Sequence, residues 1–480
     1  MAVISGVACP VCGCLCDDIE LTVENNVVTE VNNACAVGQA KFLEFSRYRL
    51  KKPLVRKNGE LVETSLDEAI RKSAQILVDA YHPILYGWSS TSCEAIRVGL
   101  ELAEEVGGVI DNTSSVCHGP SILSIQDVGM STCTLGQIRH RADLVIYWGS
   151  NPWAAHPRHI ERYTAFSEGR FQKSTWHHLV SLLRGQLAEK KRERVTERLL
   201  MREVSAPPST AEHMPPTMLR EERKLIVVDV RRTRSAEIAD YFIQVELNKD
   251  YELLQAFRML VREEDLDVDE VAGVPLELLE DVADVMVGCK FGVLFFGVGL
   301  TMSRGKLRNV DAALSLVRDL NSRTKFVIMP MRGHFNVTGA DIVFTWQTGY
   351  PYAVDFSEGC PRYNPGETSV IDVLSRGEAD AGLVVASDPV SHFPREVAQK
   401  LVENPLIVID PRVTPTTLMA DVVIPSTFVG IETEGTAYRM DGVPLPLKKV
   451  VNHPKTCPPD VEILQRILCR ARELKKTGGR

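Results

Sequence analysis

A cysteine and a histidine stand side by side in the stretch DNTSSVCHGPS, where Cys117 is followed directly by His118. Taken alone, a cysteine in a loop of this kind is most often a buried, inert thiol. The neighbouring histidine and hydroxyl side chains suggest an alternative, in which the sulfur of Cys117 takes part in the chemistry of the protein. The stretch on its own leaves both interpretations open.

Four cysteines near the start of the chain have the spacing of a metal site. Cys9, Cys12 and Cys16 form a C-x2-C-x3-C motif, and Cys35 follows after eighteen residues. Four thiolates of this kind can hold a [4Fe-4S] cluster, and zinc also uses all-thiolate sites with C-x2-C pairs. The spacing favours the cluster over zinc and over unliganded thiols. We expect Cys14 to point away from the metal.

The composition bounds the class of protein. The chain has 480 residues, 44% of them hydrophobic and 25% charged, which is ordinary for a globular protein of two or three domains. A net charge of -8 argues against a nucleic-acid partner. The sequence shows neither a signal-peptide pattern nor an apolar run long enough to span a membrane. We therefore expect a cytoplasmic protein, whose crowded cysteines bind metal and do not form disulfides.

Short apolar runs predict the strands that must position these residues, and each apolar run gives way to Gly, Ser, Asn, Asp or Pro. Such runs are typical of strands buried on both faces of a parallel sheet. They lie at 82–87, 107–115, 143–152, 224–232, 291–299, 325–330, 381–389 and 406–414. Helical patterns such as 65–80 and 308–321 alternate with them. This alternation predicts an α/β fold with doubly wound parallel sheets, whose ligands bind at the carboxyl ends of the strands.

Residues 170–223 interrupt this alternation. Their first part has the pattern of an amphipathic, locally basic helix, and their second part is a Pro-rich loop. The segment is predicted to be an insertion within one domain. It is either a solvated surface helix or a docking element for a partner subunit or electron carrier.

Six motifs occur in an order that resembles the molybdopterin oxidoreductase superfamily. They are the N-terminal cysteine motif, SSVCHGPS, YWGSNPWAAHPRH, VVDVRRTRSAEIAD, RGHFNVTGA and IETEGTAYRMDGVPL. More narrowly, the sequence is similar to the catalytic B subunits of tungsten- or molybdenum-dependent formylmethanofuran dehydrogenases. The resemblance covers nearly the whole chain outside 170–223.

The resemblance implies a tungsten or molybdenum ion held by two pyranopterin guanosine dinucleotides, with Cys117 as its protein ligand. A soft thiolate suits such a metal. His118 is then expected to donate a hydrogen bond or a proton to CO2 or formate. Arg332 is the candidate cation beside the substrate, because a guanidinium matches the two oxygens of a carboxylate. A salt bridge or a contact with a pterin phosphate is the alternative role for Arg332. His334 is expected to lie next to the residues that contact the substrate, without contacting the substrate itself.

The resemblance also places the cofactor at the strand ends. Residues expected to contact it are glycines, polar side chains and charged groups that follow the apolar runs, together with one lysine near the cysteine motif. They are Lys41, Gly149, Ser150, Asn151, Asp229, Arg231, Arg232, Gly297, Gly299, Asp388 and Asp410. A solvated lysine is an equally good interpretation of Lys41.

The domains implied by the resemblance are a [4Fe-4S] domain at 1–50 and a pterin dinucleotide-binding α/β domain at 51–138 and 330–430. A second α/β domain follows at 139–329 with its 170–223 insertion, and 431–480 form a C-terminal segment. Full-length relatives continue into a C-terminal β-barrel domain. We expect this chain to lack it, so a pterin-binding β-barrel subunit is expected as a partner.

The function implied is reversible reduction of CO2 to formate, with formate passed to an amidohydrolase-type A subunit for condensation with methanofuran. Ferredoxin-like subunits would deliver the electrons. Two alternatives remain open: a formate dehydrogenase subunit that releases free formate, and a non-catalytic paralogue in a formyltransferase/hydrolase complex. Neither a nucleic acid nor a membrane is expected as a partner.

Overall fold

The computed structural model describes residues 1–167 and 223–478. The predicted helix and Pro-rich loop of the 170–223 insertion lie outside the described residues, apart from Arg223. The chain divides into two compact units, one formed by Met1–Val116 with His334–Arg480 and the other by Cys117–Gly333. The chain thus leaves the first unit after Val116 and returns to it at His334.

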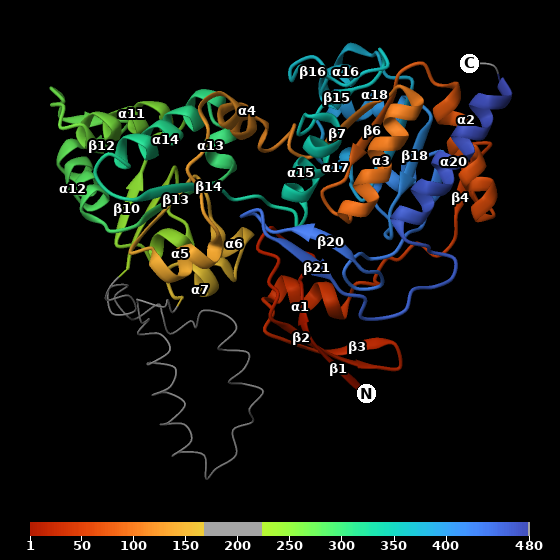
Figure 1. Cartoon of the computed structure of the whole chain (residues 1–480), viewed down its shortest axis with the longest axis horizontal. Coiled ribbons are helices and arrows are strands. Elements are labelled where there is room, and N and C mark those ends of the chain that lie inside the picture. Colours follow the sequence, from red (N-terminus) through yellow and green to blue (C-terminus); the bar gives the residue numbers. More distant parts are fainter. Residues whose placement is uncertain (168–222, 479–480) are drawn as a thin grey trace, which may run out of the picture. The chain divides into compact units, whose positions relative to one another are not determined.

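The first unit contains a nine-stranded sheet (Figure 1). In spatial order its strands are β16 (Arg362–Tyr363), β15 (Val354–Asp355), β7 (Val109–Asn112), β6 (Pro83–Gly87), β17 (Ala381–Val385), β18 (Leu406–Ile409), β19 (Val422–Ile424), β4 (Leu54–Lys57) and β5 (Glu60–Glu63). The strands from β7 to β19 run parallel, and the others are antiparallel additions at the edges. The strand order reverses between β6 and β17, which makes a crevice at their carboxyl ends.

Strand β18 shows why the parallel strands are continuous apolar runs. Leu406 and Val408 enter one hydrophobic core, while Ile407 and Ile409 enter another on the opposite face. Both faces are covered by helices, so no position of the strand can be polar without losing buried apolar area. The covering helices are α2 (Leu66–Asp79), α3 (Cys93–Val106), α15 (Val337–Thr348) and α20 (Asp460–Gly478) on one face, and α16 (Val370–Arg376) and α18 (Arg395–Glu403) on the other. The short helices α17 (Pro389–His392) and α19 (Pro415–Met419) complete this part.

The start and end of the first unit pack together. Strands β1 (Ala2–Val7), β2 (Ile19–Glu24) and β3 (Val27–Asn32) form an antiparallel sheet, followed by α1 (Ala36–Leu43). A hairpin of β20 (Gly435–Tyr438) and β21 (Pro444–Leu447) shares a small core with Ala8 and Leu15 of the cysteine-rich loop. The C-terminal stretch that looks polar in sequence belongs to α20, whose apolar side is fully buried against α2 and α3.

The second unit contains a five-stranded sheet in which every strand is parallel (Figure 1). Its spatial order is β10 (Tyr241–Gln244), β9 (Lys224–Asp229), β8 (Leu144–Trp148), β13 (Gly292–Phe296) and β14 (Phe326–Pro330). The order reverses between β8 and β13, so the expected ligand position lies at the ends of these two strands. The two parallel sheets confirm the predicted α/β fold class.

Helices cover both faces of this second sheet. One face packs on α11 (Asp250–Val261), α12 (Leu276–Gly288) and α14 (Leu307–Leu320). The other meets α7 (His159–Tyr163), because the His159 ring packs on Tyr147 of β8 and Phe295 of β13. Shorter elements are α4 (Gly119–Val128), α5 (Leu135–Arg141), α6 (Pro152–Ala155), α10 (Arg234–Glu237), α13 (Val298–Met302), β11 (Glu270–Val271) and β12 (Val274–Pro275).

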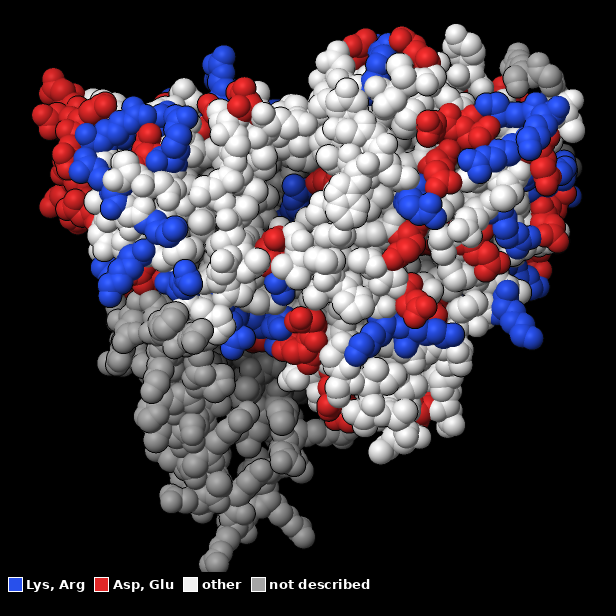
Figure 2. Space-filling model, in the orientation of Figure 1, with Lys and Arg blue, Asp and Glu red and all other residues white. Residues whose placement is uncertain are grey.

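The helices and the surface charge both bear on the expected partners. None of the helices within residues 1–167 and 223–478 is both long and apolar enough to cross a lipid bilayer. Figure 2 shows acidic and basic side chains interspersed on the face in view, with acidic ones gathered over β12 and α12. The charge in this view is therefore mixed in sign.

Candidate active site and cofactor pocket

The second unit brings Cys117, His118 and Arg332 together. Cys117 lies directly before α4, and its main-chain carbonyl accepts a hydrogen bond from the Thr301 hydroxyl over 2.9 Å. Its side chain is partly exposed. His118 is the N-cap residue of α4 and makes no side-chain capping bond to the helix. The positive end of the α4 dipole therefore faces the Cys117 segment and favours a thiolate there.

His118 is completely buried, and both of its ring nitrogens have partners. Nε2 lies 3.3 Å from the carbonyl of Met331, and Nδ1 lies 3.2 Å from the hydroxyl of Ser121. Burial and the neighbouring Arg332 and His156 charges lower the pKa of His118 to about 3. The ring is therefore neutral at physiological pH, with its Nε2 proton donated to Met331.

Arg332 follows β14 and is itself buried, with 8% of its surface exposed. Its influence on the pKa of His118 shows that the guanidinium lies close to that ring. The carbonyl of Arg332 accepts a hydrogen bond of 2.8 Å from Nε2 of His156. A buried cation therefore lies near the His118 ring.

The strand ends of β8 and β13 pass so close to each other that only glycine fits. The backbone N–H of Gly299 donates to the carbonyl of Gly149 over 3.0 Å. A Cβ on Gly299 would lie 2.6 Å from the Cα of Gly149. A Cβ on Gly297 would lie 2.5 Å from the carbonyl oxygen of Gly149. The close approach that these glycines permit is thus between two backbone segments of the protein.

The other expected cofactor residues of this unit lie at the ends of β8 and β9. Ser150 is buried, and Asn151 accepts a hydrogen bond of 2.8 Å from Ser235. Asp229 accepts the backbone N–H of Arg231 over 3.2 Å, and burial raises the pKa of its carboxyl group. The guanidinium of the exposed Arg232 lies over the Phe242 ring at 5.5 Å.

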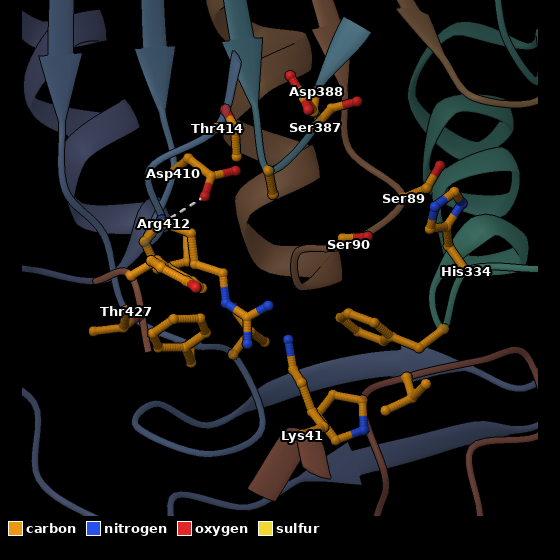
Figure 3. Close-up of a pocket in the computed structure, with 18 of the residues that line it drawn as sticks. Lys41, Ser89, Ser90, His334, Ser387, Asp388, Asp410, Arg412, Thr414 and Thr427 are labelled. Atoms are coloured by element: carbon orange, nitrogen blue, oxygen red, sulfur yellow. Dashed lines mark hydrogen bonds between the residues drawn. The ribbon is translucent and has the colours of Figure 1, made fainter. Parts of the chain in front are cut away.

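The first unit has a cavity of about 630 Å³ at the carboxyl ends of its parallel strands (Figure 3). It is lined by residues that follow β6, β7, β17, β18 and β19, among them Ser89, Thr113, Asp388 and Asp410. Figure 3 shows Lys41 reaching into it from the opposite side to Asp388, and His334 lies on its wall. The position of this cavity is the one expected for a ligand of a doubly wound sheet.

Three cations surround the Phe428 ring, and two of them, Lys41 and Arg412, line this cavity. The side chains of Lys41, Arg49 and Arg412 lie 5.2–5.3 Å from the centre of the Phe428 ring. Arg412 Nε and the hydroxyl of Thr427 are buried without hydrogen-bond partners among the described residues. Such donors are costly to bury unsatisfied, so they indicate a polar, anionic ligand in the cavity.

Two expected residues of this cavity titrate unusually. Burial raises the pKa of Asp410 to about 7, although its carboxylate accepts the Arg412 backbone N–H over 2.7 Å. Burial and the Arg412 charge lower the pKa of Lys41 to about 8, and the charges of Asp410 and Cys9 oppose this. Lys41 therefore lies within electrostatic reach of both the cavity and the cysteine-rich loop.

The four N-terminal cysteines come together between β1 and α1. The Cys9 thiol is buried, and both burial and the neighbouring Cys16, Cys12 and Cys35 raise its pKa. Sγ of Cys35 accepts the N–H of Gly38 at the start of α1, over 3.4 Å. A Cβ on Gly38 would meet the Cys9 and Cys35 sulfurs at 3.3 and 3.7 Å. A hydrogen bond from Cys14 lowers the pKa of Cys12, so Cys14 also lies near this group.

Several residues of these sites carried no signal in the sequence. Arg49, Arg412 and the adjacent pair Thr427 and Phe428 come from three separate segments. Arg412, Thr427 and Phe428 line the cavity, and Arg49 contacts the Phe428 ring. His156 was visible in the stretch NPWAAHPRH, but nothing in its spacing links it to Arg332. For the cavity residues, the one signal that could have been used is a polar residue shortly after an apolar strand, as with Arg412 after β18.

Comparison with known proteins identifies the family of the chain. Residues 49–172 match the family model described as molybdopterin oxidoreductase. The chain is 47% identical, over 98% of its length and 99% of the relative's, to the B subunit of the tungsten-containing formylmethanofuran dehydrogenase 2 of Methanocaldococcus jannaschii. Among solved structures, acetylene hydratase from Pelobacter acetylenicus matches 98% of this chain and 69% of its own, with a TM-score of 0.66 and 14% identity. A chain of the formyltransferase/hydrolase complex from Methylorubrum extorquens, solved with methylofuran, matches 88% of this chain and 99% of its own, with a TM-score of 0.63 and 21% identity.

The match of residues 49–172, together with the relative that is 47% identical, places the chain among the molybdopterin oxidoreductases, a family that implies a molybdenum or tungsten pterin cofactor. Within it, the chain belongs to the family of formylmethanofuran dehydrogenase B subunits of the tungsten-containing type.

Proposed function

We propose that the chain interconverts CO2 and formate as the catalytic subunit of a formylmethanofuran dehydrogenase. The observation that carries the proposal is 47% identity, over 98% of the chain, to a tungsten-containing B subunit. The grouping of Cys117, His118 and Arg332 in the second unit supports it. A bound tungsten or molybdenum bis(pyranopterin guanosine dinucleotide) would supply the two-electron exchange with CO2, and a [4Fe-4S] cluster would supply the electron route to it.

The cavity of the first unit fits part of such a cofactor. The two cations that line it, Lys41 and Arg412, and the unsatisfied donors of Arg412 and Thr427 suit phosphate oxygens. We infer that Lys41, Asp388 and Asp410 contact the same ligand. In the second unit, Ser150, Asn151, Asp229, Arg231 and Arg232 are the proposed contacts, with Gly149, Gly297 and Gly299 shaping the loops.

We infer that Cys9, Cys12, Cys16 and Cys35 hold a [4Fe-4S] cluster and not a zinc ion. Four thiolates around one zinc ion lie about 3.8 Å apart, from a Zn–S distance of about 2.3 Å. Within residues 1–167 and 223–478, no three Cys, His, Asp or Glu side chains are grouped closely enough for a single ion. The thiols nevertheless influence the pKa of Cys9. A cubane does not need four thiolates around a single ion, because each thiolate binds its own iron.

The protein groups at the reacting position have separate tasks. Cys117 is the proposed metal ligand, and the N-terminus of α4 favours its thiolate form. Arg332 would bind the carboxylate oxygens of formate and stabilise the negative charge that develops on CO2. Whether His118 donates a proton to the substrate stays a prediction, since both of its nitrogens have protein partners.

Partners follow from the same family. Relatives of this chain are subunits of multi-subunit complexes. We infer an amidohydrolase-type A subunit that condenses formate with methanofuran, a pterin-binding β-barrel subunit, and ferredoxin-like subunits that deliver electrons.

Metal analysis of the purified complex, together with Cys117→Ser, tests the function. We expect tungsten or molybdenum with pterin and iron in the wild type. The variant should lose CO2 reduction while its iron content and cluster EPR signal remain, because the two sites use different ligands. Zinc or no metal in the wild type would indicate a non-catalytic paralogue. Release of all formate to solvent, in the presence of methanofuran, would instead indicate a formate dehydrogenase.

A further inference from the structure

Two buried histidines hold the consecutive main-chain carbonyls of Met331 and Arg332, which lie on either side of the Arg332 Cα. Nε2 of His118 lies 3.3 Å from the Met331 carbonyl, and Nε2 of His156 lies 2.8 Å from the Arg332 carbonyl. The N–H of Met331 is also held, by the carbonyl of Phe296 at 2.8 Å. The backbone that carries the Arg332 side chain is thus fixed from three directions.

The protonation of His156 follows from its partner. A carbonyl oxygen can only accept, so Nε2 of His156 must carry a proton. Burial lowers the pKa of this ring, which makes the neutral form the one present at physiological pH. Its Nδ1 is then an acceptor, and it is buried without a hydrogen-bond partner among the described residues.

This single hydrogen bond is unusual for a residue that is only 2% exposed. Burying an imidazole with one nitrogen unsatisfied costs free energy, and an apolar side chain at this position would avoid that cost. The bond to the Arg332 carbonyl is therefore the polar interaction that explains a histidine here.

We propose that His156, together with His118, is a positioning residue for Arg332. It acts through the main chain and sets the direction in which the guanidinium leaves the end of β14. This inference rests on the proposed function, in which Arg332 binds formate. A displacement of about 1 Å at a reacting group can lower turnover about 100-fold, so a rigid backbone is required at this point.

His159 provides a matched control, because it is a fully buried histidine close to His156 in the chain. Its side chain serves a different group, since Nδ1 lies 2.8 Å from the Tyr147 hydroxyl. Like His156, it has one buried nitrogen without a partner among the described residues. Replacing it should cost similar stability without touching Arg332.

The experiment compares His156→Leu, His156→Asn, His156→Gln and His159→Leu in the full complex. Formate binding is measured by calorimetry and formate KM by kinetics, with tungsten or molybdenum content and Tm recorded for each variant. We expect His156→Leu and His156→Asn to weaken formate binding about 10- to 100-fold, because a misdirected guanidinium loses a charge-assisted hydrogen bond to the carboxylate. His156→Gln should recover most of the affinity, because its amide nitrogen can take the place of Nε2. His159→Leu should lower Tm and leave formate affinity unchanged.

A double-mutant cycle with Arg332→Lys separates the possible failures. If His156 acts through Arg332, the loss in the double variant should be smaller than the product of the two single losses. Unchanged formate affinity in His156→Asn, with Arg332→Lys still impaired, would overturn the positioning role. Unchanged affinity in Arg332→Lys itself would instead overturn the proposed substrate role of Arg332. If His156→Leu does not fold, the Asn and Gln pair decides the question.

Discussion

Gly299 donates its backbone N–H to the carbonyl of Gly149 over 3.0 Å, and this bond joins the start of α13, which follows β13, to the loop after β8. These strands flank the point at which the strand order of the second sheet reverses. The contact therefore lies where a doubly wound sheet opens its ligand crevice. It brings the two segments together without side chains between them.

Gly299→Ala should destabilise the protein, because the new Cβ would lie 2.6 Å from Cα of Gly149 and the backbone must move. We expect a loss of about 1–3 kcal/mol, as for other overpacked sites, measured as a lower Tm or denaturation midpoint. Gly288→Ala is the matched control, since nothing lies within 4 Å of its added Cβ. Equal stability of both variants would contradict the close packing described.

Arg332→Lys should lower turnover with formate about 10- to 100-fold while metal and pterin content stay unchanged. Lysine keeps the charge but loses the planar pair of donors, and a charge-assisted hydrogen bond contributes about 1.5–3 kcal/mol. The measurement is kcat and KM together with cofactor analysis of the same preparation. Loss of pterin would assign Arg332 to cofactor binding.

Cys12→Ala should remove the iron-sulfur cluster and with it CO2 reduction by a protein electron donor. The metal centre at Cys117 should still load, because it uses other ligands. Iron content and the EPR signal of the cluster are the measurements. Cys360→Ala, at an exposed thiol outside the cysteine-rich loop, is the control and should change neither. CO2 reduction that survives in Cys12→Ala would remove the cluster from the electron path.

Asp410→Asn should change how stability depends on pH. The folded-state pKa of Asp410 is raised to about 7 by burial, above the value of about 3.9 for an unfolded chain. The folded state therefore binds this proton more tightly, and the resulting stability is lost as pH rises from about 4 through 7. We expect the Tm of wild type minus that of the variant to fall between pH 5 and pH 7.5. A difference that is constant or rises over this range would show that Asp410 ionises normally.

The sequence alone determined eight of the strands in the two sheets and the identity of the thiols. All eight apolar runs contain strands, because a strand covered by helices on both faces needs a continuous apolar run, as in Leu406–Ile409. Antiparallel edge strands such as β15 and β16 were not predicted, because strands of two residues with mixed side chains show no periodic pattern in the sequence. The spacing of Cys9, Cys12, Cys16 and Cys35 is likewise local information.

Only the tertiary structure decided which groups meet. His156 and Arg332 are 176 positions apart, and His118 and Met331 are 213 apart, yet each pair shares a hydrogen bond. Lys41 and Arg412 likewise reach the same Phe428 ring from distant segments. Parallel strands bring their carboxyl ends to one edge of a sheet, whatever the length of chain between them. The sequence can mark a residue as the end of a strand, but the order of strands in the sheet determines its neighbours.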